Sequence, residues 1–346
     1  MRPRSLVLLI FCLALAACGG GTNAPGASTS SRGVVSPGPA PSGGVRIARL
    51  TYPLTGLPAP NRAVLRRPSL AVKIDNVQGA WPQSGLNQAD IVFDGEAEGG
   101  LTRLMAVFQS QSSNLVGPVR SARPGDARLL RLFHGGYFAY SGASSAEIAP
   151  VFALSHAVTL SDTLHPAAYF RRNDHTAPHN LFSTTDRLYA ALRSRGRYEP
   201  GPPAVFSYAS ATPSGVPTHQ VRVPFPAATA QWTWNGHQYL RTQDGSPDVL
   251  MTGARVSADN VVVMSVRVVG TGIFEMNGSE DPMPVTIGSG PVWVLRNGVR
   301  VTGTWSRPSI GAPLRLRDHH GHTIALLPGR TWVELMPSTE KATFGR

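Results

Sequence analysis

"EGGLTRLMAVFQSQSSNLVGPVRSARPGD", residues 98–126, combines a turn, a strand and the approach to a helix in one short segment. The two glycines after Glu98 indicate a tight turn, because glycine adopts positive φ angles without strain. The apolar run from Thr102 to Gln109 predicts a buried strand. We therefore expect a glycine turn that leads directly into the core of the protein, with Arg103 at the start of the strand.

Two arginines, Arg120 and Arg123, precede a predicted helix, DARLLRLFHGG, whose N-cap we expect to be Asp126. The N-terminus of a helix attracts anions, and guanidinium groups bind phosphate or carboxylate in a bidentate manner. Two interpretations stay open: the arginines bind an external anion, or they form internal ion pairs. The candidate internal partners are Asp75, Asp94, Glu96 and Glu98.

The sequence around this segment mixes strands and helices. Apolar runs at residues 70–74 and 89–93 predict two further strands. Two pairs resemble capping boxes that open helices, namely Ser144 with Glu147 and Ser183 with Asp186. We expect residues 49–200 to form an N-terminal mixed α/β domain.

The second half of the sequence has a different pattern. Residues 201–219 are rich in proline, glycine and serine and are expected to be a connector. Beyond them, short alternating runs flank Asn235-Gly236 and Asn297-Gly298, two dipeptides that favour hairpin turns. We expect residues 220–340 to form a mostly antiparallel β domain. The predicted fold class is therefore α+β, with an N-terminal mixed α/β domain followed by a mostly antiparallel β C-terminal domain.

The N-terminus has the features of a bacterial lipoprotein signal. Basic residues precede an apolar run, and Leu-Ala-Ala stands directly before Cys18, so we expect residues 1–17 to be removed. Cys18 would carry the lipid, and residues 18–48 would form a disordered tether. The predicted location is the outer face of the cytoplasmic membrane. Because Cys12 is lost with the signal, no cysteine remains for a disulfide or a metal site.

The charge of the chain is strongly positive. It has 32 lysines and arginines against 20 aspartates and glutamates, a formal net charge of +12. Only Lys73 and Lys341 are lysines, and the arginines are spread along the sequence without a basic block. We therefore do not expect nucleic acid as the partner. At close range the charge favours anionic wall polymers or lipid headgroups.

A second polar segment covers residues 162–180. It contains Asp162, His165, Asp174, His175 and His179. Imidazole and carboxylate groups are ordinary metal ligands, but no metal-binding spacing is present, so we predict no metal and no other cofactor. The alternatives are a general acid or base, with His179 preferred, and histidines that only satisfy local hydrogen bonds. Glu98 is a second acid–base candidate, because with Glu96 it weakly resembles a glycosidase pair.

Other features of the sequence indicate structure rather than chemistry. It lacks a nucleophile elbow, a P-loop and a dinucleotide-binding glycine motif. Five tryptophans are candidates for stacking on sugars, although β-rich domains more often bury such residues in the core. They are Trp232, Trp234, Trp293, Trp305 and Trp332. The histidines around Gly321, namely His319, His320 and His322, are expected on an exposed hairpin turn.

Five motifs occur in the order and spacing of the YerB-like bacterial lipoproteins, a family with an N-terminal and a C-terminal domain of unknown function. They are AVKIDN, PQSGLNQADIVF, EGGLTRLMAVFQS, GPVRSARPGD and APHNLF, and the chain resembles this family from Thr51 to Pro337. The resemblance implies an exported, lipid-anchored protein but no reaction, substrate or cofactor. The matching positions are Asp75, Asn76, Gln83, Ser84, Gly85, Glu98, Arg103, Arg120, Ser121, Arg123, His179 and Asn180.

From these positions we predict a ligand-binding site near Arg120. Its members are Asp75, Asn76, Glu98, Arg103, Arg120, Arg123, His179 and Asn180. Two functional classes stay open. The first is a binding or scaffold protein, anchored to the membrane through Cys18, that recognises an anionic cell-wall polymer or another envelope protein. The second is an envelope hydrolase or transferase on a phosphate-bearing glycopolymer, with His179 or Glu98 as acid or base.

Overall fold

The computed structural model describes residues 49–143, 145–194, 200–211, 214–274 and 278–346. The predicted signal peptide, Cys18 and the tether lie outside these ranges, and so does Ser144 of one predicted capping box. All described residues belong to one compact unit. Within the described ranges, no helix is long and apolar enough to cross a membrane.

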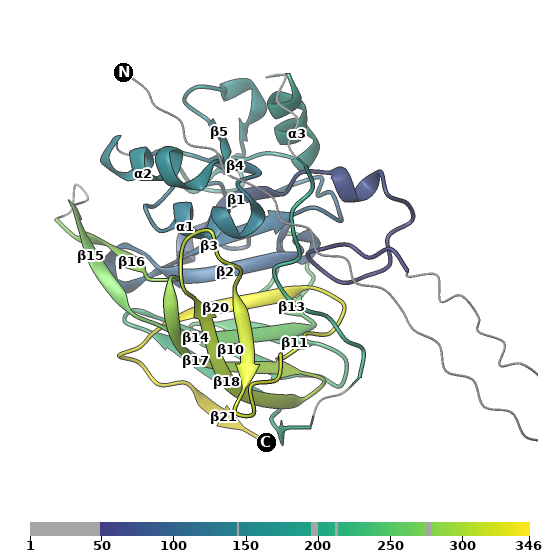
Figure 1. Ribbon diagram of the computed structural model, residues 1–346. Coiled ribbons are helices and arrows are strands. Elements are labelled where there is room, and N and C mark those ends of the chain that lie inside the picture. The colour runs from purple at the N-terminus through teal and green to yellow at the C-terminus, as the bar shows by residue number, and fades with distance from the viewer. Residues whose placement is uncertain (1–48, 144, 195–199, 212–213, 275–277) are drawn as a thin grey trace, which may run out of the picture. The chain divides into compact units, whose positions relative to one another are not determined.

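The centre of the fold is a mixed sheet of eleven strands (Figure 1). Ten of them follow in the order β19-β18-β17-β14-β20-β2-β3-β1-β4-β5, and β8 pairs with β18. Their bounds are β1 Leu70–Asp75, β2 Ile91–Glu96, β3 Thr102–Phe108, β4 Tyr137–Tyr140, β5 Val158–Ser161, β8 Val216–Pro217, β14 Asn260–Val266, β17 Gly288–Arg296, β18 Val299–Arg307, β19 Arg315–Asp318 and β20 Thr331–Pro337.

The segment at residues 98–126 supplies β3, which pairs antiparallel with β1 on one side and β2 on the other. Every residue of β3 is buried, as expected for an apolar strand that is covered on both faces. On the other side of β2 lies β20, which runs parallel to both β2 and β14. Strands from the two ends of the sequence therefore share one sheet.

A second sheet of six strands packs against one face of the large sheet, with which it shares an apolar core. Trp232 and Tyr239 of the second sheet are buried in this core together with Val72 and Trp332 of the large sheet. The bounds are β9 Gln220–Phe225, β10 Ala228–Trp234, β11 Tyr239–Gln243, β12 Ser246–Pro247, β13 Ser257–Ala258 and β21 Thr343–Gly345. Two pairs of strands complete the β structure, β6 Phe170–Arg171 with β7 Leu181–Phe182 and β15 Val268–Phe274 with β16 Glu280–Pro284.

Helices pack against parts of both faces of the large sheet. The α-helices are α1 Asp126–Leu130, α2 Ser145–Ser155 and α3 Thr185–Arg193, and the short 3-10 helices are η1 Val64–Arg66, η2 Gln78–Ala80, η3 Leu86–Gln88, η4 Glu98–Gly100, η5 Arg131–Phe133 and η6 Pro166–Ala168. Leu130 of α1 and Val151 of α2 share a second apolar core with Phe93 and Met105. Leu188 of α3 belongs instead to the core that the second sheet covers. The predicted α+β class is confirmed.

The structure agrees with the predictions about one hairpin turn and about three of the tryptophans. Asn297 and Gly298 have φ angles of 50° and 69° and form the two-residue turn between β17 and β18. Trp232, Trp305 and Trp332 are buried, in agreement with the core interpretation. The predicted connector also contributes to the core, because Val205 and Phe206 are only 6% exposed.

Two predicted helix caps were wrong by one residue. Asp126 is the first residue of α1 and not its N-cap, which is Gly125. The Asp126 carboxylate reaches back to accept a hydrogen bond of 2.8 Å from the backbone N–H of Arg123. Thr184, and not Ser183, caps α3 by accepting a hydrogen bond from the N–H of Arg187. In both cases the residue with the stronger capping preference lies next to the observed N-cap, so the preference alone did not locate the helix start to the residue.

Candidate functional site

The carboxylate of Asp75 is the centre of the candidate site. Asp75 ends β1, where the antiparallel register places it opposite Arg103 of β3. Its side chain is fully buried, and Arg103 Nη1 lies 3.1 Å from Oδ1. The other oxygen, Oδ2, lies 2.9 Å from Arg120 Nε and 2.6 Å from His179 Nδ1. One buried carboxylate therefore holds two guanidinium groups and one imidazole.

Backbone contacts bring Arg120 and His179 to this carboxylate. The Arg120 N–H donates to the carbonyl of Lys73, so the segment after β3 runs beside β1. The loop that carries His179 is closed by a hydrogen bond from its N–H to the carbonyl of Thr176. The side chains of Arg120 and His179 are 25% and 23% exposed, whereas Asp75 is not exposed at all. They are therefore the part of the site that solvent reaches.

Arg103 connects Asp75 to a larger group of buried charges. Arg103 Nη2 lies 2.7 Å from Glu98, and the other oxygen of Glu98 lies 2.8 Å from Arg123 Nη2. Arg123 also contacts Glu147 at 2.7 Å and Asp281 at 3.2 Å. We call these seven side chains the ion network: Asp75, Glu98, Arg103, Arg120, Arg123, Glu147 and Asp281. It draws on β1, β3, η4, α2 and β16, and hence on both halves of the sequence.

The charges of the ion network shift the pKa values of its acids in opposite directions. Burial acts to raise the pKa of Glu98, but Arg103 and Arg123 outweigh it and hold that pKa at about 2. Burial raises the pKa of Asp281 to about 7, although Arg123 acts against this shift. The two guanidinium groups therefore favour the ionised form of Glu98, which weakens the case for the acid–base role considered for it.

The internal ion pairs decide between the two interpretations for Arg123. Its guanidinium is 8% exposed and surrounded by three carboxyl groups, so no face is left for an external anion. Helix α1 has only five residues, which is too short for an anion site at its N-terminus. Its first residue, Asp126, also pairs with Lys73 at 2.7 Å. Arg120 differs, since it uses only Nε for Asp75.

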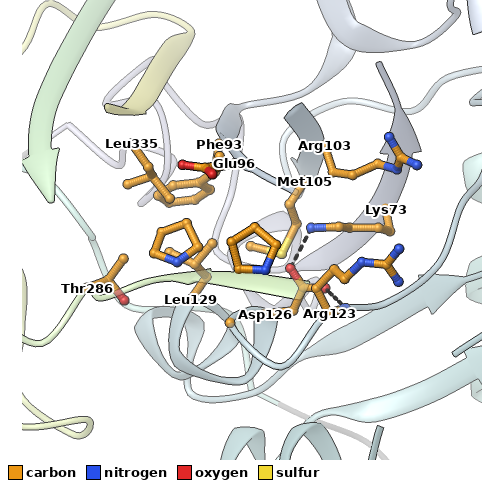
Figure 2. A pocket seen from close by; sticks show the side chains of 14 residues that line it. Lys73, Phe93, Glu96, Arg103, Met105, Arg123, Asp126, Leu129, Thr286 and Leu335 are labelled. Carbon is orange, nitrogen blue, oxygen red and sulfur yellow. Dashed lines mark hydrogen bonds and ion pairs between the residues drawn. The ribbon is translucent and has the colours of Figure 1, made fainter. Parts of the chain in front are cut away.

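A small pocket adjoins the ion network (Figure 2), and Pro282 and Pro284 of β16 line part of it. Lys73, Arg103 and Arg123 lie together at one end of it, and Phe93 and Leu335 line the other. The dashed lines in Figure 2 mark the contacts that Asp126 makes to Lys73 and Arg123. The pocket has a volume of about 30 Å³, which accommodates ordered water but no larger ligand.

Two members of the predicted site have other roles. Asn76 is 3% exposed and cross-links the strand ends, because it donates to Thr102 at 2.7 Å and accepts from Gln83 at 2.9 Å. Asn180 accepts a hydrogen bond from Arg171 and donates one to the carbonyl of Arg172. We assign both to local structure, since neither contacts the Asp75 carboxylate through any hydrogen bond in the described ranges.

The polar segment at residues 162–180 does not assemble into one cluster. His175 contacts the neighbouring Asp174, while His179 contacts Asp75 on β1. Across the described residues, no group of three or more His, Cys, Asp or Glu side chains is arranged to hold a metal ion. His179 contacts the ion network through Asp75.

Sequence reasoning missed a second group of buried charges, between the two sheets. Arg241 of β11 is fully buried and lies 2.6 Å from Asp94 of β2 and 2.7 Å from Asp248. Its guanidinium is 4.8 Å from the centre of the Trp332 ring, in cation–π geometry. Glu334 of β20 is the register neighbour of Asp94 and completes the group. We call Asp94, Arg241, Asp248 and Glu334 the interface cluster.

Burial and the charge of Asp94 raise the pKa of Glu334 to about 8, against the opposing effect of Arg241. Glu334 Oε1 accepts a hydrogen bond of 2.7 Å from Trp232 Nε1. When Glu334 is protonated, the charged groups of the cluster are the carboxylates of Asp94 and Asp248 and the guanidinium of Arg241. One sequence signal was available, because a single acidic residue within the apolar strand TWVELMP indicates a buried and partnered charge.

The fold and these contacts define the class: an α+β protein in which one mixed sheet joins both halves of the chain and buried ion clusters lie where they meet. Two family descriptions match it, "Protein of unknown function (DUF3048) N-terminal domain" over residues 54–198 and the DUF3048 C-terminal domain over residues 221–333. The chain belongs to this family. The resemblance to YerB-like proteins predicted from the motifs is thereby confirmed.

Two comparisons with individual proteins agree with this assignment. The chain is 28% identical over 306 residues to "Putative lipoprotein YerB" of Bacillus subtilis (strain 168), an alignment that covers 86% of this chain and 89% of the relative. The crystal structure of YerB from Bacillus subtilis matches with a TM-score of 0.73 at 24% identity, over 86% of this chain and 100% of that one. The two proteins therefore share a fold.

Proposed function

We propose that the protein is an exported, lipid-anchored binding or scaffold protein of the bacterial cell envelope, and that Arg120 and His179 bind an anionic group of an envelope component. One observation carries the proposal. Both side chains are held by the same oxygen of Asp75, at 2.9 Å and 2.6 Å, and both are about a quarter exposed.

The free hydrogen-bonding groups of this pair suit an anion. Arg120 donates to Asp75 through Nε alone, and no acceptor in the described part of the chain takes its Nη groups. His179 uses Nδ1, which leaves Nε2 available. A phosphate or carboxylate can accept two N–H groups from one guanidinium in a bidentate manner. Because Asp75 already fixes both side chains, little conformational entropy is lost on binding.

The proposed location follows from the sequence and from the relative. Residues 1–17 act as the signal, Cys18 carries the acyl chains, palmitate among them, and the folded part lies on the outer face of the cytoplasmic membrane. The name of the Bacillus subtilis relative, a lipoprotein, supports this location. The partners we propose are the membrane, through Cys18, and an anionic cell-wall polymer or another envelope protein. We propose no cofactor.

One observation favours the second functional class, an envelope hydrolase or transferase on a phosphate-bearing glycopolymer. The contact between His179 Nδ1 and Asp75 leaves Nε2 as a base, which is the arrangement of an oriented catalytic histidine. Arg120 beside it would stabilise negative charge that develops in a transition state. In this class His179 is the acid–base residue, since Glu98 is held as an anion by two guanidinium groups.

A thermal-shift titration of the full chain with inorganic phosphate tests the site. A ligand at 100 times its Kd stabilises a protein by about 2.7 kcal/mol, and we expect Arg120→Gln to abolish this effect. Arg171→Gln, an exposed arginine that contacts Asn180, is the matched control and should keep the effect. The proposal is overturned if phosphate does not stabilise the wild type, or if phosphate stabilises Arg120→Gln as much as the wild type.

The enzyme class is tested separately by turnover of a phosphate-bearing glycopolymer. An enzyme should lose turnover in His179→Ala while phosphate still binds to Arg120. A binding protein should release no product with either the wild type or the variant.

A further inference from the structure

The three strands at one end of the large sheet carry a concentrated positive charge. Within β17, β18 and β19 there are five arginines and one aspartate, a net charge of +4. The arginines are Arg296, Arg300, Arg307, Arg315 and Arg317, and the aspartate is Asp318. Such an imbalance creates a positive potential that attracts anions over several ångströms.

Three of these arginines have structural roles. Arg296 and Arg307 are buried and donate to backbone carbonyl groups, and Arg300 lies 4.1 Å from the centre of the Phe344 ring. Carbonyl and aromatic partners stabilise a guanidinium but do not cancel its charge. The positive potential of this end of the sheet therefore persists.

The remaining two, Arg315 and Arg317, are exposed and contact no carboxylate in the part of the chain that the structure describes. Arg317 donates only to the carbonyl of Gly321. Asp318 is the nearest acid in sequence, but alternation along β19 puts it on the opposite face. There it accepts hydrogen bonds from the N–H groups of His320 and His322.

The register of the strands aligns hydroxyl groups with these arginines. Ser289 of β17 is opposite Ser306 of β18, and Ser306 is opposite Arg315 of β19. In the next row on the same face, Thr304 is opposite Arg317. Directly opposed residues lie about 4.5–5.5 Å apart, so hydroxyl and guanidinium donors reach a common ligand.

Ser289, Ser306, Arg315 and Arg317 line a groove of about 640 Å³, which Pro308 and Pro313 also line. Arg315 and Arg317 are two residues apart on one strand, or about 6.8 Å. This separation allows each guanidinium to bind a different phosphate of one chain. Hydroxyl groups and bidentate guanidinium groups are the usual donors to phosphate oxygens.

We propose that this surface, the β17–β19 face formed by Ser289, Ser306, Arg315 and Arg317, binds a linear polymer of phosphate esters. The site is separate from Arg120 and His179, because six strands lie between β19 and β1 in the order of the sheet. It does not depend on the function proposed for Asp75 and its partners. A polymer that crosses the face contacts both arginines at once, so its affinity should exceed that of a single phosphate.

The test is a calorimetric titration of the full chain, in neutral detergent, with a glycerol-phosphate oligomer. The double variant Arg315→Gln/Arg317→Gln should bind about a hundredfold more weakly, at about tenfold for each charge-assisted contact. The control Arg171→Gln/Arg222→Gln makes the same charge change at exposed positions on other strands and should bind like the wild type. Affinity should also fall steeply with added salt.

A second variant keeps the test independent of charge. Ser306→Ala removes only a hydroxyl and should weaken oligomer binding by about threefold to tenfold. Equal losses in the double variant and its control, or no loss in either, would overturn the proposal and indicate a diffuse charge effect. Binding of anionic lipid vesicles in place of the oligomer would also contradict it. Arg120→Gln should leave the oligomer titration unchanged, so this proposal and the function proposed above fail separately.

Discussion

The interface cluster predicts an unusual dependence of stability on pH, which Glu334→Gln should remove. In the folded protein Glu334 is fully buried beside Asp94, and its pKa is about 8 instead of the usual 4.5. A carboxyl group whose pKa is raised on folding binds its proton more tightly in the folded state. Its contribution to stability is therefore fully present below pH 4.5 and is lost as the pH rises through about 8.

The size of this effect follows from the two pKa values. A shift of one unit corresponds to about 1.36 kcal/mol, so a shift from 4.5 to about 8 corresponds to roughly 5 kcal/mol as an upper bound. The Glu334→Gln side chain is neutral at every pH. It retains an oxygen that can accept the hydrogen bond from Trp232 Nε1. The free energy of unfolding of the variant should therefore rise relative to that of the wild type as the pH increases from 5 to 8.

Urea unfolding at pH 5, 6, 7 and 8, followed by tryptophan fluorescence, measures this difference. Trp232 and Trp332 lie beside the cluster and report on its disruption. Glu280→Gln, at an exposed position of β16, is the control and should run parallel to the wild type. If the difference between Glu334→Gln and the wild type stays constant from pH 5 to 8, then Glu334 is ionised in the folded protein and the reasoning is refuted.

Three further predictions concern the ion network and the sheet. Arg123→Met should lower the free energy of unfolding by about 3–5 kcal/mol, because three carboxyl groups lose their cation; a loss below 1 kcal/mol in urea unfolding would contradict the assigned contacts. Asp75→Asn should replace the single Nδ1–H tautomer of neutral His179 with a mixture, visible in imidazole nitrogen NMR, whereas an unchanged tautomer would show that Asp75 does not orient the ring. Gly303→Ala should destabilise the protein by more than about 2 kcal/mol in thermal unfolding, because an added Cβ would lie 2.0 Å from the Arg317 carbonyl oxygen; a neutral result would mean that β19 moves freely.

The candidate site was partly predictable. The motifs that contain Asp75, Arg103, Arg120 and His179 singled out residues whose side chains do converge, because strand ends and the loops beside them bring polar groups together. Asn180 was included for its position in the same motif, yet its neighbours in the fold are Arg171 and Arg172. A motif shows which residues occur together in the sequence, but not which of their side chains are in contact.

The local elements follow from the sequence by itself. The run at β3, the Asn297-Gly298 turn and the buried tryptophans depend on alternation and on backbone preferences that act between near neighbours. Glu98 was among the expected partners of Arg123, whereas its contacts with Glu147 of α2 and Asp281 of β16 had no such signal.

Only the tertiary structure placed β20 between β2 and β14, and only this placement buries Glu334 beside Asp94. The arginines of β17, β18 and β19 are by contrast close in sequence, and the pairing of consecutive strands keeps them together. The placement of β20 has a different physical reason. Strand order is determined by which faces can be buried together, and that is a property of the whole chain rather than of any segment.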